Sequence, residues 1–327
     1  MKRRDILTCG SAWVASETLA VRTAFAKPKY PERPIRLVIP SPAGSVGDGA
    51  GRQWAHAMEA LLGPVVIENQ GGGAGAIAAA NVAHAEPDGY SILLGGVGIM
   101  VLMPIAGHVR YDASKDLTPI SIVGVAPNAV VVNPSLPVRD LRELVDYAKA
   151  NPGKLSYGSA GAGTITHLTG ELFKSLTGTN DIVHVPYTGQ PHAISDLISG
   201  HILMAVTGVT GQMLELHHSG KLRMLAVTAP TRLIAAPEIP TAVEQGLAGM
   251  VAHNFYGLFA PAGTNKAIIE QIAEATRAAI ADSEFHEKLI ASGFEPYPDS
   301  SPEAARRFIQ NEIDRWQPVA KAIGLKV

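Results

Sequence analysis

The sequence predicts an α/β protein made of two α/β units that are joined by two crossings of the chain. From residue 31 onward, strand-like segments alternate with helix-like segments, an order typical of mostly parallel sheets covered by helices. A strand, a Gly/Ser-rich loop and a helix follow one another in the same way at residues 36–62 and 155–177. The chain has 327 residues, 46% of them hydrophobic and 17% charged, which is enough for two buried cores.

The first copy of this pattern contains the strand-like run 36–39, the loop 40–49 (the first loop) and a helix. The helix is predicted from apolar residues at helical spacing, namely Trp54, Met58, Leu61 and Leu62. Asp48 opens this helix. Two roles for its carboxylate are open: an N-terminal cap, or contact with a ligand or hinge.

The second copy has the loop 158–167 (the second loop) between the strand end 155–157 and a helix over 166–177 that Gly178 can end. Its three glycines allow a tight turn and a close approach to a ligand. The first N–H groups of a helix have no partner within it and carry roughly half a positive charge, which suits a carboxylate or phosphate. Ligands of α/β proteins bind where strand ends meet helix starts, so we expect the two loops to face one cleft.

The other elements follow in order along the chain. We expect strands at 64–69, 91–94, 130–132, 182–185, 202–206 and 222–227, helices at 77–85, 139–150 and 190–199, an irregular stretch at 230–240, and three helices after residue 261. The chain is expected to cross between the units near 126–130 and to return at 256–261. The predicted domains are therefore 27–127 with 252–327, and 128–251, with a hinge between them.

The first 26 residues have the features of an export signal peptide. Lys2-Arg3-Arg4 precedes the mildly apolar segment 6–16, and Ala24-Phe25-Ala26 is a small-residue cleavage site. The pair Arg3-Arg4 also fits a twin-arginine signal, so the export route stays open. Cleavage after Ala26 would remove Cys9, the only cysteine, and with it disulfides and thiol chemistry. We expect a periplasmic protein.

Composition and motifs argue against several other classes. A net charge of −2 with no basic patch argues against nucleic-acid binding, and after the signal peptide no run of about 18 apolar residues could span a membrane. The glycine-rich stretch 71–76 fits the dinucleotide fingerprint weakly, because three residues separate it from its strand and the expected acidic residue is missing. We expect no cofactor and no metal.

Hydrolase chemistry has only partial support. The segment 43–47 resembles a nucleophile elbow that lacks its first glycine, and Ser159 lacks that pattern too. Of the histidines, His167 stands out because it falls in the first turn of a predicted cleft helix. Tyr187 precedes another predicted helix, where its ring either packs or brings its hydroxyl to the cleft.

Several segments carry a resemblance to a known family. They are Tyr30-Pro31 with 34–36, the first loop with Asp48, Glu68-Asn69, 87–90, 157–161 with His167-Leu168, 184–189 and 257–264. On these segments, from about Tyr30 to the C-terminus, the chain resembles the Bug family of extracytoplasmic solute-binding proteins that serve tripartite tricarboxylate transporters. The resemblance implies a type II periplasmic-binding-protein fold that closes over a small mono- or dicarboxylate, held largely by loop backbone and ordered water, and integral membrane permease subunits as partners.

The residues expected to bind the ligand combine the two loops with the resemblance. They are Ser41, Pro42, Ala43, Gly44, Asp48, Gly96, Ser159, Ala160, Gly161, Thr164, His167, Tyr187, Gly189 and Thr207. The chain departs from the family's pattern at several of them, for example at Ser41, where an aromatic residue is usual. Thr207 replaces a common aspartate, which favours a ligand without a free amino group. The alternatives are a secreted two-domain esterase and a ligand sensor for a signalling receptor.

Overall fold

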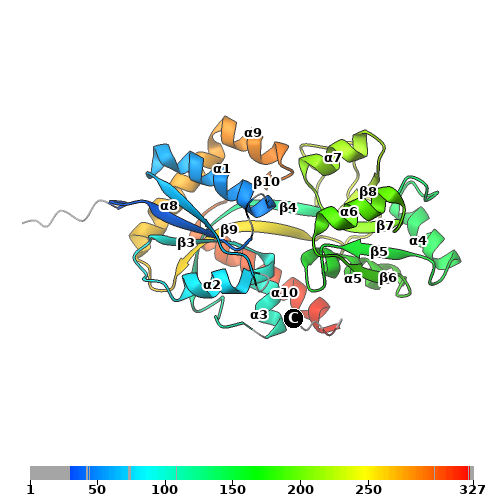
Figure 1. Cartoon of the computed structure of the whole chain (residues 1–327), viewed down its shortest axis with the longest axis horizontal. Coiled ribbons are helices and arrows are strands. Elements are labelled where there is room, and N and C mark those ends of the chain that lie inside the picture. Colours follow the sequence, from blue (N-terminus) through cyan, green and yellow to red (C-terminus); the bar gives the residue numbers. More distant parts are fainter. Residues whose placement is uncertain are drawn as a thin grey trace, which may run out of the picture.

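A computed structural model describes residues 30–322 except 42, 44, 73, 74, 108 and 298, together with Gly324. The signal peptide predicted over residues 1–26 lies outside the described residues. Within them, no helix is both long and apolar enough to cross a membrane. Two groups of elements, here called the first and second lobes, are linked by two long strands, β4 (Leu117–Val132) and β9 (His253–Pro261) (Figure 1).

The first lobe is built on the parallel strands β2, β1 and β3, to which β9 and the first part of β4 add antiparallel strands. Its elements are β1 (Ile35–Ile39), α1 (Val46–Leu61), β2 (Val65–Asn69), α2 (Ala76–Ala83), β3 (Ser91–Gly96), the π-helix η2 (Gly98–Leu102), α3 (Met103–Ala106), α8 (Lys266–Ala281), α9 (Ser283–Ala291), β10 (Glu295–Pro296) and α10 (Pro302–Ala322). One face of this sheet packs on α1, α8 and α9 around Trp54 and Phe285, and the other on α2, η2 and α10 around Trp316.

The second lobe is built on the parallel strands β7, β5 and β6, with β8 and the end of β4 antiparallel to them. Its elements are α4 (Leu141–Ala150), β5 (Ser156–Ser159), α5 (Ile165–Thr177), β6 (Val183–Pro186), α6 (Gln190–Ser199), β7 (Met204–Gly208), α7 (Gly211–His218) and β8 (Arg223–Val227). Alternate residues of β7 face opposite cores. Met204 and Val206 join the core with Phe173, and Ala205 joins the core with Met213.

All strands and helices expected from the sequence are present, with ends shifted by a few residues except for the strand expected at 130–132, which is the end of the much longer β4. Two other expectations are wrong. The sheet is not mostly parallel, because β4 and β9 run antiparallel to the strands beside them. Residues 256–261 are not the return crossing. They lie inside the first sheet, paired with β3 and β4, and the chain crosses back just before His253. β4 changes partners from β9 to β7 and β8 between Pro127 and Asn128.

The two lobes also touch outside the crossing strands. On one side α10 packs against α5, and Ile165 and Leu168 of α5 belong to a core cluster that is otherwise drawn from the first lobe. On the other side, a Cβ added at Gly293 would stand 2.8 Å from the carbonyl oxygen of Val209. The backbones of the α9–β10 turn and of the segment that starts α7 are therefore in close contact.

Candidate functional site

The carboxyl ends of the two parallel strand sets point toward each other. β3 runs antiparallel to β9 and ends at Gly96, which pairs with Tyr256, whereas β7 runs antiparallel to β4 and ends at Gly208, which pairs with Asn128. Tyr256 in turn pairs with Gly124 of β4. The end of β3 therefore lies level with Gly124 and the end of β7 level with Asn128, four residues further along β4. At about 3.3 Å per residue, that is a distance of roughly 13 Å. Helices α1, α5 and α6 follow β1, β5 and β6, so they begin at the same junction (Figure 1).

The first loop is organised by buried polar contacts. Ser45 is the N-cap of α1 and accepts a hydrogen bond from the N–H of Asp48. Asp48 is only 3% exposed, and its two carboxylate oxygens accept hydrogen bonds from Asn69 Nδ2 at 3.0 Å and Arg52 Nε at 2.9 Å. Asn69 also donates to the carbonyl of Ser41 at 3.0 Å. Of the two roles open for Asp48, the cap belongs to Ser45, and Asp48 ties the loop to β2.

The surface of the first loop is formed by small residues and one tyrosine. Ser41 is half-buried with its Oγ 2.6 Å from Ser45 Oγ, and Ala43 is exposed. Pro42 and Gly44 lie outside the described residues. Tyr256 of β9 lies against this loop, since a Cβ added at Gly47 would be 3.0 Å from its ring. Burial raises the pKa of Tyr256 to about 12, so its hydroxyl is neutral.

Gly96 and Asn254 complete the first-lobe side of the junction. Gly96 is partly exposed, and a Cβ there would stand 2.9 Å from the carbonyl oxygen of Phe255. The neighbouring Asn254 Oδ1 accepts hydrogen bonds from the N–H groups of Val97 and Phe255. A side chain at Gly96 would therefore push β3 away from β9.

Most N–H groups of the second loop before α5 already donate hydrogen bonds. The N–H of Ala160 donates to Thr166 Oγ1 at 2.9 Å, that of Gly161 to Ser159 Oγ at 3.2 Å, and that of Gly163 to His167 Nδ1 at 3.1 Å. Thr164 is the N-cap of α5. Within the described protein, the N–H groups of Ala162, Ile165 and Thr166 donate no hydrogen bond, which leaves them for an anion or water.

A stack of three rings supports the second loop. The His167 and His184 rings are parallel, 4.1 Å apart with an interplanar angle of 14°, and Tyr157 stacks on His184 at 4.9 Å. His184 Nε2 lies 2.7 Å from Ser159 Oγ. The Tyr157 hydroxyl lies 2.8 Å from Glu171 Oε1 and 3.1 Å from the carbonyl oxygen of His167. The ring stack therefore fixes both ends of the loop.

The electrostatics of the ring stack favour neutral imidazoles. Burial lowers the pKa of His167, with Glu171 opposing and Lys174 adding to the shift. Burial and the neighbouring His167 lower the pKa of His184 to about 4. Burial also raises the pKa of Tyr157, so the hydroxyl stays protonated and can donate to Glu171.

Two of the expected ligand contacts are corrected by the structure. Thr207 is 1% exposed and lies on the face of β7 that it shares with Ala205, so its hydroxyl is buried in the lobe and does not line the junction. That hydroxyl has no hydrogen-bond partner among the described residues. The Tyr187 hydroxyl points along α6 and lies 2.8 Å from Asp196. The strand pleat places the Thr207 side chain in the lobe, whereas the hydrogen bond to Asp196 holds the Tyr187 hydroxyl beside α6.

Ser159 is also inaccessible, whereas the remaining residues expected on the second lobe are partly exposed. Ser159 is fully buried, but Ala160, Gly161, Thr164 and His167 are partly exposed. Gly189, with φ 146°, is the N-cap of α6. The next residue, Gln190, holds the end of β7 by two hydrogen bonds to the backbone of Gly208, at 2.8 and 2.9 Å.

Sequence reasoning missed residues that organise the junction from outside the two loops. They are Asn69, His184, Gln190, Asn254 and Tyr256. Asn69 lies at the end of β2 and Gln190 at the start of α6, whereas His184 lies within β6. For Asn69 and Gln190, the position at a strand end or helix start is a signal in the sequence that the residue could organise the junction. Asn254 and Tyr256 offer no such signal, because the sequence predicts a crossing at 256–261 and so does not indicate that they lie between two strand ends.

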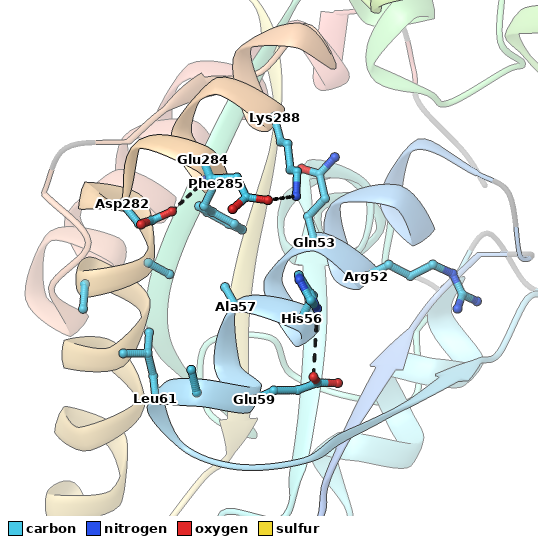
Figure 2. Close-up of a pocket in the computed structure, with 13 residues that line it drawn as sticks. Arg52, Gln53, His56, Ala57, Glu59, Leu61, Asp282, Glu284, Phe285 and Lys288 are labelled. Atoms are coloured by element: carbon cyan, nitrogen blue, oxygen red, sulfur yellow. Dashed lines mark hydrogen bonds and ion pairs between the residues drawn. The ribbon is translucent and has the colours of Figure 1, made fainter.

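A separate groove of about 700 Å³ lies on the outer face of the first lobe, between α1, α8 and α9 (Figure 2). Its floor is apolar and includes Ala57, Leu61 and Phe285. Its two cations are already engaged, Arg52 with Asp48 at 2.9 Å and Lys288 with Glu284 at 2.5 Å. The groove therefore has fewer unengaged positive groups for an anion than the junction has. Among the described residues, no group of three or more His, Asp or Glu side chains could hold a metal ion.

Comparisons with known proteins agree with this geometry. Residues 50–325 match the model of the tripartite tricarboxylate transporter family receptor, TctC. Protein BugT of Bordetella pertussis is 32% identical over 95% of this chain and 95% of its own length. A solved structure, R. palustris Rpa4515 with adipate, is 32% identical, with a TM-score of 0.80 over 91% of this chain and 99% of that one.

A second solved structure, MatC from Rhodopseudomonas palustris with bound malate, is 28% identical, with a TM-score of 0.76 over 89% of this chain and 99% of that one. These matches confirm the expected fold, that of periplasmic binding proteins of the TctC type. Facing strand ends, a ring-supported glycine loop and the match over residues 50–325 lead to one conclusion: the chain belongs to the tripartite tricarboxylate transporter receptor family, together with the Bug proteins.

Proposed function

We propose that this protein is an exported periplasmic receptor that captures a small mono- or dicarboxylate and delivers it to the membrane permease subunits of a tripartite tricarboxylate transporter, without chemistry. The observation that carries the proposal is the junction where the carboxyl ends of two parallel strand sets face each other, with the starts of α1, α5 and α6 around it. Helix N-termini bind anions. The adipate and malate in the two similar structures support a carboxylate as the ligand.

The proposed ligand site contains the accessible residues of the junction. We assign to it Ser41, Ala43, Gly96, Ala160, Gly161, Thr164 and Gly189 as ligand contacts and His167 as the ring that supports the second loop, and we keep Pro42 and Gly44 as predictions. The proposed domains are 27–127 with 252–327, and 128–251, which close by a hinge where β4 changes partners. Residues 1–26 are proposed to direct export and to be removed.

A titration with matched compounds tests this function. Calorimetry and thermal unfolding are measured with adipate, malate and succinate, and with adipamide, which has the adipate chain but no charge. We expect at least one acid to bind one-to-one and to stabilise the protein by about 2.7 kcal/mol at 100 times its Kd, with adipamide inactive. Small-angle scattering of the same complex should show a smaller radius of gyration. Binding of only neutral or amine compounds, or an unchanged radius, would contradict the proposal.

One observation favours an esterase as the second candidate. Ser159 Oγ lies 2.7 Å from His184 Nε2, which is the spacing of a nucleophile and its base. However, Ser159 is fully buried, and no described carboxylate forms a hydrogen bond with His184. An ester substrate could not reach the hydroxyl without rearrangement of the loop. Hydrolysis of p-nitrophenyl esters that disappears in Ser159→Ala would favour this candidate over the receptor.

A further inference from the structure

His167 is bound to the second loop in a way that fixes its protonation state. Its Nδ1 accepts a hydrogen bond from the backbone N–H of Gly163 at 3.1 Å. A backbone N–H can only donate, so Nδ1 must carry no proton and the neutral ring must carry its proton on Nε2. A second proton, on Nδ1, would set two donors against each other. The loop would then lose the bond that joins Gly163 to α5.

The groups around His167 make this contact sensitive to charge. On α5 itself, Glu171 and Lys174 form an ion pair at 2.9 Å. The His184 ring, on β6, lies parallel to the His167 ring at 4.1 Å. The Tyr157 hydroxyl, on β5, lies 3.1 Å from the carbonyl oxygen of His167. α10 meets α5 near the apolar residues Ile165 and Leu168. Two imidazolium ions in this stack would repel each other, so the pair gains its protons one at a time.

We propose that His167, in its neutral form, is a positioning residue that holds the second loop in the conformation that binds a carboxylate, so that acidification releases the ligand. The inference rests on the proposed function and adds to it a form of regulation. The carboxylate contacts the loop, and His167 acts on it through Gly163.

The direction of the effect follows from the two protonation states. Burial lowers the pKa of His167 below its ordinary value, so near pH 7 the ring is neutral and the Gly163 contact is intact. As the pH falls through the acidic range, His167 gains a proton and the contact is lost. A ligand that needs the neutral ring must, by reciprocity, lower the pKa of His167 further when it binds. A tenfold loss of affinity corresponds to a downward shift of about one pKa unit.

Two substitutions separate the acceptor from the charge. His167→Asn keeps an acceptor oxygen near the place of Nδ1 but does not titrate, and His167→Leu removes the acceptor. Calorimetry with adipate is run on the full mature chain at pH 7.5, 6.0 and 5.0. We expect His167→Asn to bind like wild type at pH 7.5 and progressively more tightly than wild type as the pH falls, approaching about tenfold once the wild-type imidazole is fully protonated. We expect His167→Leu to bind about tenfold more weakly than His167→Asn at every pH, since Gly163 then lacks its acceptor.

Comparing variants at one pH removes the titration of adipate itself, which affects all three proteins equally. NMR of the wild-type imidazole nitrogens gives an independent readout. The free protein should show His167 with its proton on Nε2, and adipate should lower the pKa of His167.

The inference is overturned if the wild-type to His167→Asn affinity ratio does not change with pH, if acid strengthens wild-type binding, or if adipate leaves the pKa of His167 unchanged. Failure of the proposed function looks different, because then no carboxylate binds to wild type even at pH 7.5.

Discussion

At the scale of single residues, the buried contacts decide which side chains can meet a ligand. The sequence places both loops between a strand and a helix, as they are in the structure, but it does not distinguish a residue that could contact a ligand from one that supports the loop. Asp48 and Ser159 are supporting residues, 3% and 0% exposed. Their partners, Asn69 and His184, are distant in sequence. Contacts of this kind depend on how β1 pairs with β2 and β5 with β6, which local patterns do not record.

Gly161 is where the loop conformation can be tested directly. Its φ is +136°, and a Cβ would stand 3.0 Å from the carbonyl oxygen of Tyr187. We expect Gly161→Ala to cost about 1–3 kcal/mol of stability through backbone strain, and to weaken carboxylate binding at least tenfold because the loop must move. Calorimetry and urea unfolding measure the two effects.

Gly153→Ala is the matched control. Gly153 also has a positive φ, +71°, but a Cβ there would have nothing within 4 Å. It should cost about 1–2 kcal/mol for the left-handed conformation and leave affinity unchanged. Wild-type affinity in Gly161→Ala would show that the second loop is only a connection.

At the scale of elements, most helices and strands could be predicted because their apolar residues repeat regularly and their ends carry glycine or a capping residue. β4 is the exception. Only its last three residues were expected to form a strand, but it has 16 residues. Pro119 and Pro127 interrupt its pattern. The first adjoins a register shift against β9, and the second lies where β4 changes sheets. A proline usually argues against a central strand, but it is tolerated where the pairing is irregular. The two prolines therefore hid the first part of β4.

α5 contains a glycine that the ring stack requires. A Cβ at Gly170 would stand 2.2 Å from Tyr157 Cε2 and 2.4 Å from its Cζ. A rigid ring stacked on His184 cannot yield as a flexible chain end can. We expect Gly170→Ala to destabilise the protein by about 1–3 kcal/mol by overpacking, although alanine favours helix. Denaturant unfolding measures the change.

Gly49→Ala in α1 provides the comparison, because Gly49 is exposed and a Cβ there meets nothing within 4 Å. It should stabilise the protein by about 0.5–1 kcal/mol through helix propensity alone. Equal effects of the two substitutions would mean that the ring of Tyr157 is not held in place.

At the scale of the whole molecule, the lobes are joined by more than the two crossing strands. α10 packs against α5, and the α9–β10 turn packs against the segment before α7. These contacts lie beside the crossing strands. If the lobes close on a ligand, the packed surfaces must therefore either stay in contact or slide past each other. The predicted two-crossing hinge therefore describes the chain path but omits these contacts, which come from helices near the C-terminus. Nothing in the sequence of α10 states which lobe it will touch.

The position of β9 has a consequence for the order in which the protein can assemble. β9 lies between β3 and β4 in the sheet but follows the whole second lobe in the chain. Leu93 of β3 pairs with Phe259 of β9, and the whole second lobe lies between them in the sequence, whereas Ser156 of β5 and Val183 of β6 are separated only by α5 and its flanking loops. Long loops cost more entropy to close, so the second lobe can form first.

During synthesis from the ribosome, the early strands β1–β3 therefore emerge long before the strand that completes their sheet. We expect pulse-labelled hydrogen exchange during refolding to protect the amides of β5–β7 before those of β3 and β9. Simultaneous protection would show that the two lobes assemble as one cooperative unit. In a cell, the N-terminal third of the chain is the part that most needs a chaperone, because it is synthesised before β9, the strand that pairs with β3.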